Sequence, residues 1–155
     1  EAKNVAMFAR HGIYTETEIK SRQDLNMEDY AKDIHIEALT SLDMLGKMIV
    51  PACTAYSKML AEGVAAKKSI GVDAPAEVAA VRELTDKTAE LMALEEKLKD
   101  AVAGEPEELN ERAMYEHETV IPAMEAARKV ADELELKVGK AYWPMPTYAD
   151  LLFYV

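Results

Sequence analysis

The sequence contains a single cysteine, Cys53, among its 155 residues. One cysteine cannot form a disulfide within its own chain, so the disulfide-stapled folds of small secreted proteins are excluded. We therefore expect the protein to work in the reducing cytoplasm. Cys53 lies in an apolar stretch, where it is expected to act as a small buried hydrophobic residue and not as a reactive thiol.

Positive charge is also scarce. The chain has 18 Lys and Arg against 29 Asp and Glu, which gives a formal net charge of −11. Surfaces that bind nucleic acids or anionic membranes depend on clustered Lys and Arg, so neither partner is expected. The sequence has no apolar run of about 18 residues, which is the length that a membrane-spanning helix needs.

Glycine and aromatic residues are sparse too, whereas hydrophobic residues make up 50% of the chain. This composition favours helix over sheet. Between Asn26 and Lys68 the apolar residues recur at intervals of three, four and seven, which predicts one long helix with a buried face and with Asn26 as its N-cap. That face comprises Tyr30, Ile34, Leu39, Leu42, Ile49, Tyr56, Leu60 and Val64. A rod of about 60 Å needs partner helices of similar length, so the predicted fold class is all-α, an elongated bundle.

The rest of the chain supplies those partners. Two further long helices are predicted over 77–103 and 107–138, separated from their neighbours by the turn residues of 69–75 and 104–106. The predicted buried face of the first comprises Val78, Val81, Leu84, Leu91, Leu94 and Leu98, and that of the second comprises Leu109, Ala113, Val120, Met124, Ala127, Val130, Ala131 and Leu134. Short loops between long amphipathic helices place the three in an up-down-up arrangement.

The first 25 residues are predicted to form short helices. Residues 2–11 form the first of these, ended by Gly12, and the capping box from Thr15 to Glu18 starts the second. We divide the chain into short helices that link to an upstream catalytic part (1–25), the long bundle (26–138) and an apolar docking tail (139–155), all within one structural domain.

Pro51 and Pro122 fall inside the predicted helices. A helical proline lacks the N–H of its turn and clashes with the carbonyl four residues before it, so each is expected to kink its helix. The apolar pattern continues on both sides, so neither should end it. If the first and third helices end at the same level, the two kinks lie in one layer of the bundle.

Residues 139–155 differ in character from the bundle, because they hold the only Trp, two prolines and very little charge. So much apolar surface is not expected to stay in water at a free terminus. The tail can fold back along its own bundle, or it can pack on something outside this chain. The residues alone leave both possibilities open.

The tail carries the clearest motif. Residues 143–153 read WPMPTYADLLF, which resembles the C-terminal signature W-P-x-P-[ST]-Y-x-D-L-L-F of the type III glutamine synthetases. The segment from Glu18 to Arg22, followed by Tyr30, Lys32 and the triplet 36–38, is similar to the stretch that follows the catalytic core in this family. The resemblance covers the whole chain, although 69–118 adds little to it beyond helical character.

The resemblance implies the helical C-terminal domain of a large ATP-dependent ligase. Members of the family make glutamine from glutamate and ammonia with divalent ions (magnesium or manganese), and they assemble as two stacked hexameric rings. Their nucleotide, metal and glutamate ligands lie upstream, so no catalytic, cofactor-binding or metal-binding residue is assigned here. The docking residues that the motif implies are Trp143, Pro144, Pro146, Tyr148, Asp150, Leu151, Leu152 and Phe153.

A self-contained catalytic or metal site is not expected from the spacing of ligand-type residues. A di-iron bundle needs a Glu three residues before each His, but Lys32 precedes His35 and Met114 precedes His117 at that distance. His35 is interpreted as a half-buried packing residue and His117 as a structural or surface residue. The acidic residues of 105–108 are interpreted as a solvated start of a helix.

Three functions follow from these observations. The leading hypothesis is a non-catalytic domain of a glutamine synthetase that serves subunit packing or oligomer assembly, with its own catalytic domain and neighbouring subunits as partners. The second is a free-standing acidic helical adaptor that binds another protein. The third, a carboxylate-bridged metalloenzyme, needs ligand spacings that the sequence lacks.

Overall fold

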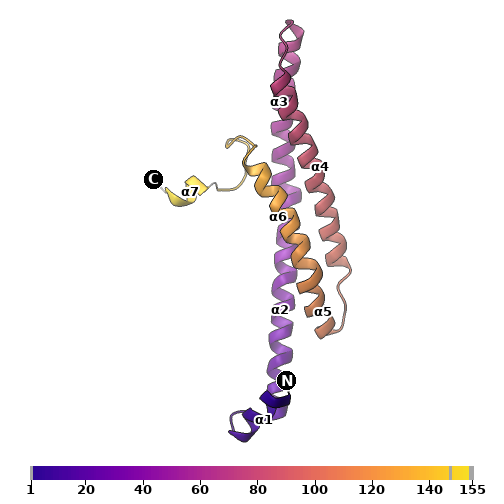
Figure 1. Cartoon of the computed structure of the whole chain (residues 1–155), viewed down its shortest axis with the longest axis vertical. Helices are drawn as coiled ribbons and strands as arrows, with labels where there is room; N and C mark the ends of the chain where they lie inside the picture. The colour runs from indigo at the N-terminus through magenta and orange to yellow at the C-terminus, as the bar shows by residue number, and fades with distance from the viewer. Residues whose placement is uncertain (1, 147, 154–155) are drawn as a thin grey trace.

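The computed structural model describes residues 2–146 and 148–153, and it shows an elongated bundle with the C-terminal segment standing off to one side (Figure 1). The predicted all-α class is confirmed, since the described residues contain no strand. None of the described helices has the length and apolar character that crossing a membrane requires.

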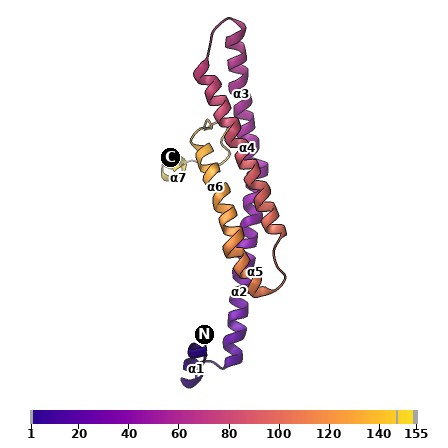
Figure 2. The same ribbon diagram turned by 45° about the vertical axis from the view of Figure 1, so that its right-hand side comes forward.

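One helical rod of 54 residues runs the length of the molecule. It consists of α2 (Glu16–Met44), the π-helical turn η1 (Leu45–Ile49) and α3 (Val50–Ser69). At ~1.5 Å per residue it is about 80 Å long. The other elements pack along this rod or continue from its ends, as Figure 2 shows.

The predicted capping box starts this rod. The hydroxyl of Thr15 accepts the N–H of Glu18 at 3.3 Å, and the Glu18 carboxylate accepts the N–H of Thr15 at 2.7 Å. The expected N-cap at Asn26 is wrong, because α2 runs straight through this residue. No glycine or proline lies between Thr15 and Gly46, so nothing in this stretch ends the helix that the capping box begins. The short helix α1 (Ala2–Arg10) precedes it as predicted, and Gly12 (φ +64°) makes the turn between them.

Two helical segments return along the rod. After a turn in which Gly71 has φ +79°, α4 (Pro75–Ala103) begins with a proline, whose fixed φ suits the first helical position. The second segment consists of α5 (Leu109–Tyr115), the π-turn η2 (Glu116–Val120) and α6 (Ile121–Glu135). α4 packs against α3 and α6, and α5 packs against α2, which gives the predicted up-down-up order.

Pro51 and Pro122 both follow directly on a π-turn. The N–H of Val50 reaches the carbonyl of Leu45, and the N–H of Ile121 reaches that of Glu116, five residues back in each case. This wider turn relieves the clash between the proline ring and the turn before it. Neither proline ends its helical rod, as predicted, and the bend of the helix axis stays a prediction.

The expected common level of the two prolines is wrong. Ser41 contacts Met124 across the bundle, so Pro122 lies beside α2, well before η1 and Pro51. Residue 139, just past the end of α6, lies against Tyr56, whereas α3 continues to Ser69. The helices do not end together because α3 and the first turns of α4 extend beyond α6 as a two-helix hairpin (Figure 2).

The predicted buried faces of the second and third helices are confirmed. Leu84, Leu91 and Leu98 of α4 and Val130 and Leu134 of α6 are buried. On the rod itself Ile49 is buried but Leu39 is 47% exposed, because Ala38 takes the inward position in this turn. The main core cluster comprises Leu45, Ile49, Cys53, Leu84, Leu91, Ala127, Val130, Ala131, Leu134, Val138 and Trp143.

Candidate docking surface and buried polar cluster

The first part of the tail folds back on the bundle. The backbone N–H groups of Tyr142 and Trp143 donate to the carbonyl of Gly139, which forms a compact turn after α6. Gly139 is required there, since a Cβ on it would lie 3.1 Å from the Tyr56 ring. The rings of Tyr56 and Tyr142 then pack with their centroids 5.2 Å apart.

Trp143 anchors this turn. Its side chain is 9% exposed and belongs to the main core cluster, together with Leu45, Ile49 and Cys53 of the long rod. Fully burying a large aromatic side chain is among the largest single apolar contributions to a fold. The indole Nε1 is buried and has no hydrogen-bond partner among the described residues, so this anchor is held by apolar packing.

The end of the tail behaves differently. The short helix α7 (Tyr148–Leu152) stands away from the bundle in Figure 1. Leu151, Leu152 and Phe153 are 69%, 65% and 73% exposed. An ion pair from Lys140 to Asp150 ties α7 to the turn that holds Trp143. Three large apolar side chains in succession are therefore offered to solvent at a fixed place.

Of the docking residues that the motif implies and whose side chains the structure describes, only Trp143 is buried. Pro144 and Pro146 are exposed, and Pro146 lines a groove of about 320 Å³ together with Met145 and residues of α2, η1 and α6. The side chain of Tyr148 lies outside the described part of the structure. The fold-back is thus realised by 139–146. Residues 151–153 stay exposed, and packing on a surface outside this chain stays a prediction.

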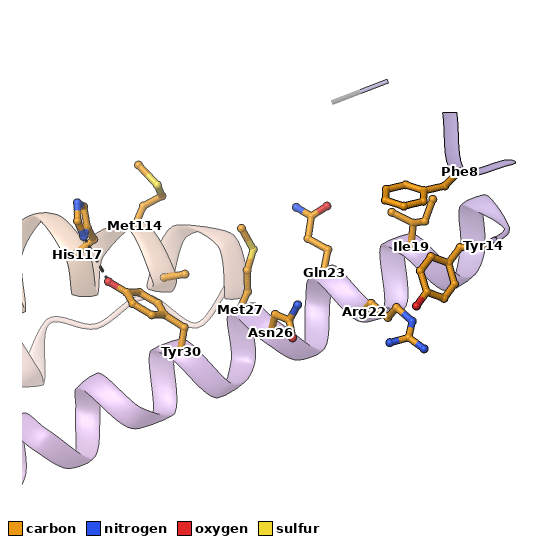
Figure 3. Close-up of a pocket in the computed structure, with 11 residues that line it drawn as sticks. Phe8, Tyr14, Ile19, Arg22, Gln23, Asn26, Met27, Tyr30, Met114 and His117 are labelled. Carbon is orange, nitrogen blue, oxygen red and sulfur yellow. Dashed lines mark hydrogen bonds between the residues drawn. The ribbon is translucent and has the colours of Figure 1, made fainter. Parts of the chain in front are cut away.

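A second apolar surface lies at the opposite end of the rod. Figure 3 shows a groove of about 580 Å³ along α2, with Phe8, Ile19 and Tyr14 at one end and Tyr30, Met114 and His117 at the other. The Arg22 guanidinium lies 4.5 Å from the centroid of the Tyr14 ring. Sequence reasoning missed this groove, because its walls come from α1, α2, α5 and η2, and their approach depends on the bundle.

His117 takes the structural role predicted for it. Its Nδ1 lies 3.3 Å from the hydroxyl of Tyr30, which joins η2 to α2 at the edge of the groove (Figure 3). Cys53 is fully buried, and burial raises the pKa of its thiol, as expected of an unreactive cysteine.

A polar cluster is buried between α2, the loop before α5, and η2. Nδ1 of His35 lies 2.6 Å from Oε1 of Glu105, and Nη2 of Arg112 donates to Oε2 of the same carboxylate at 2.7 Å. Glu116 completes the cluster from η2, and its Oε1 lies 3.9 Å from Nε of Arg112. The solvated position predicted for Glu105 is wrong, since its side chain is 9% exposed and its acceptors serve His35 and Arg112.

Glu116 is the most unusual member of this cluster. It is 0% exposed, and neither of its carboxylate oxygens has a hydrogen-bond partner among the described residues. Burial and the nearby charge of Glu105 raise the pKa of Glu116 to about 7, against a smaller opposing effect from Arg112 and His35. No sequence pattern indicates this site, because its members come from three separate segments with no common spacing.

The matches to known proteins fit the tail motif. The model of the family described as "Glutamine synthetase C-terminal domain" matches residues 1–68. Over 97% of its length the chain is 36% identical to a glutamine synthetase of Butyrivibrio fibrisolvens and 31% identical to a type-3 glutamine synthetase of Dictyostelium discoideum. A glutamine synthetase of Bacteroides fragilis is 30% identical over 91% of the chain.

The chain spans about a fifth of the length of these curated relatives, 22%, 22% and 20% respectively. The matched region is the C-terminal part of the relatives. The similarity extends through 69–118, where the sequence carries no motif beyond helical character.

Proposed function

Because this chain belongs to the family of glutamine synthetase C-terminal domains, we propose that it serves subunit packing in an oligomeric glutamine synthetase and takes no direct part in catalysis. The exposed apolar face of α7 carries this proposal. Leu151, Leu152 and Phe153 are too exposed to stabilise their own bundle, yet α7 is tied to the bundle through Lys140 and the Trp143 anchor. An exposed apolar face of this kind suits docking onto a partner surface.

The partner that we propose is the upstream catalytic part of the same polypeptide or of a neighbouring subunit. The relatives are about five times longer than this chain, so most of their surface is absent here. The apolar face of α7 lies away from the bundle axis (Figure 1), so a neighbouring subunit can reach it. This position is consistent with homo-oligomer assembly through α7.

Catalysis belongs to the rest of the polypeptide in this proposal. We propose a cytoplasmic, ATP-dependent ligase that joins ammonia to glutamate with the help of divalent metal ions, with its nucleotide and substrate sites upstream. The acidic surface of the domain, with a net charge of −11, suits a protein that avoids nucleic acid and anionic membranes.

The test is sedimentation velocity on the whole polypeptide that carries this domain. The variant replaces Leu151, Leu152 and Phe153 by Ser, which removes the apolar face and leaves Trp143 and Met145 in place. A loss of the oligomer, or its conversion to smaller species, is the expected result. The matched control replaces Ile70 and Val72, two exposed apolar residues of the α3–α4 turn, by Ser.

An unchanged sedimentation profile for the triple variant would contradict the packing role. A native polypeptide no larger than 17.2 kDa would contradict the parent enzyme as well and would favour the free-standing adaptor. The control variant is expected to sediment like the unaltered protein, because the α3–α4 turn takes no part in the proposed interface.

A further inference from the structure

We propose that His35, Glu105 and Glu116 form a binding site for a divalent transition-metal ion, with Zn²⁺ as the best-suited ion, that fastens the loop before α5 and the π-turn η2 to the long rod. One nitrogen or oxygen atom from each of the three side chains lies within 4.8 Å of the other two. The proposal departs from the sequence-based expectation that the chain has no metal site, and it is independent of the role of α7.

The unpartnered carboxylate of Glu116 carries the argument. An ionised carboxylate that is fully enclosed without a hydrogen bond is costly, so native proteins almost always pair it with a positive charge or a metal ion, or leave it protonated. Arg112 meets this need only in part, because its Nη2 donates to Glu105 and its Nε lies 3.9 Å from Oε1 of Glu116, which is within ion-pair distance but too far for a hydrogen bond. With His35 neutral, two carboxylates and one guanidinium leave a net charge of −1.

The donor set fits an ion of the zinc type. Zn²⁺ binds imidazole nitrogen and carboxylate oxygen at about 2.0–2.2 Å, so adjustments of less than about 1 Å would bring the three ligand atoms to one centre. Mg²⁺ prefers an all-oxygen octahedron and is less suited to a site with a histidine. Water can complete the coordination, since the His35 side chain is 31% exposed and leaves a route from solvent.

Arg112 suits the role of an orienting residue. It binds Oε2 of Glu105, so Oε1 stays directed at His35, where the cation would replace the proton that now lies between them. Hydrogen bonds of this kind, from outside the ligand set to a metal-binding carboxylate, commonly hold such a ligand in place. With the guanidinium counted, the net charge of the site would change from −1 when empty to +1 when occupied.

Because a metal ion binds ligand atoms that carry no proton, the affinity should rise with pH.

The test is isothermal titration of the chelator-treated 155-residue chain with ZnCl₂, MnCl₂ and MgCl₂ at pH 6.5 and pH 7.5. One equivalent of Zn²⁺ should bind, more tightly at pH 7.5, with Mg²⁺ at least tenfold weaker. Thermal unfolding should move upward by about 5 °C or more when Zn²⁺ exceeds its Kd a hundredfold.

The variants His35→Gln and Glu116→Gln should each weaken Zn²⁺ binding at least tenfold and reduce the thermal shift by about half or more at the same Zn²⁺ concentration. The matched control is His117→Gln, which removes the imidazole of the residue next to Glu116 outside the cluster and should bind like the unaltered chain. Circular dichroism checks that each variant is helical, and Glu116→Gln is expected to fold at least as well as the unaltered chain.

Three results would overturn the proposal. One is the absence of stoichiometric binding in the helical chain. Another is Zn²⁺ binding by both cluster variants that is as tight as binding by the unaltered chain, which would mean an adventitious surface site. The third is a loss of binding in His117→Gln equal to that in the cluster variants.

Discussion

The tip of the tail and the buried polar cluster break the usual pattern of burial in opposite directions. At the tip, Leu151, Leu152 and Phe153 lie in water although they are apolar. In the cluster, Glu116 is fully enclosed although it is a carboxylate, and its oxygens have no hydrogen-bond partner among the described residues. Each deviation indicates the kind of counterpart that it lacks, an apolar surface in one case and a positive charge or proton in the other.

The tail shows the same contrast over a short distance. Trp143 and Leu151 belong to one apolar motif, yet the first is part of the core and the second is exposed. The turn at Gly139 directs Trp143 onto the rod, whereas α7 stands away from the bundle (Figure 1). Apolar composition therefore predicts that a segment will dock, and only the fold shows which part of it docks on its own chain.

The largest expected effect on stability separates these two parts of the tail. Trp143→Ala should lower the free energy of unfolding by about 3–5 kcal/mol, because it removes a large side chain from the core and leaves a cavity. The control Phe153→Ala should change it by less than about 0.5 kcal/mol in the isolated chain. Urea unfolding followed by circular dichroism measures both, and similar losses in the two variants would break the comparison.

Most substitutions of a buried residue lower the free energy of unfolding, but Glu116→Gln should raise it at high pH. The pKa of Glu116 is raised from 4.5 to about 7 in the folded chain, so the folded state holds a proton that the unfolded state has released. Stability therefore falls as the pH rises from about 4.5 to about 7, and the loss is complete above that range. The glutamine cannot ionise, so with a chelator present the variant should be more stable at pH 8 by up to about 3 kcal/mol.

The check on this variant is its pH profile in urea unfolding. The two proteins should have nearly equal stability at pH 4 and diverge as the pH increases. The neighbouring exposed residue serves as the control, since Glu118→Gln should leave the profile unchanged. Parallel profiles for Glu116→Gln and the unaltered chain would mean that the carboxylate is not protonated by burial.

Thr15 differs from Glu116, because its polar side chain has hydrogen-bond partners. Thr15→Ala should lower the free energy of unfolding by about 1 kcal/mol, because the N-cap hydroxyl accepts the N–H of Glu18 and the capping box is lost. Thr17, just inside the same helix, provides the matched control, and Thr17→Ala should have a smaller effect. Thermal unfolding compares the two, and equal shifts would contradict the specific role of the cap.

The smallest effect is expected from the ion pair that ties α7 to the bundle. Lys140→Ala removes the partner of Asp150, but both side chains are substantially exposed, and such pairs contribute about 0–1 kcal/mol. Thermal unfolding of the isolated chain should shift by no more than 1–2 °C. A large loss would mean that α7 is part of the cooperative bundle and not a separate docking element.

Periodicity predicted the parts of the fold that depend on local sequence. The inward positions of α4 and α6, the capping box at Thr15 and the stop at Gly12 follow from spacing and from residue type alone. The false break at Asn26 arose because an isolated asparagine resembles an N-cap, although it lies within an uninterrupted helix. The prediction that Pro51 and Pro122 lie at one level was wrong, because the lengths of the helices do not determine how far they are shifted along one another.

The sites depended on information that local patterns do not contain. Tail residues were recognised through their motif, but the burial of Trp143 required the position of η1 and α6 around it. His35, Glu105 and Glu116 are up to 81 residues apart in sequence, so nothing in their spacing indicated that they meet. Glu105 in particular looked like a solvated helix start, and it is the packing of α5 against α2 that encloses it.

The central claim is that α7 is a docking element that finds its partner outside this chain. Hydrogen exchange of the backbone amides of residues 150–153 tests it most directly, measured in the isolated chain and in the assembled whole polypeptide. The account predicts rapid exchange in the isolated chain and at least tenfold slower exchange in the assembly, with the amides of the α3–α4 turn equally fast in both. Equal exchange at 150–153 in the two samples would contradict the claim.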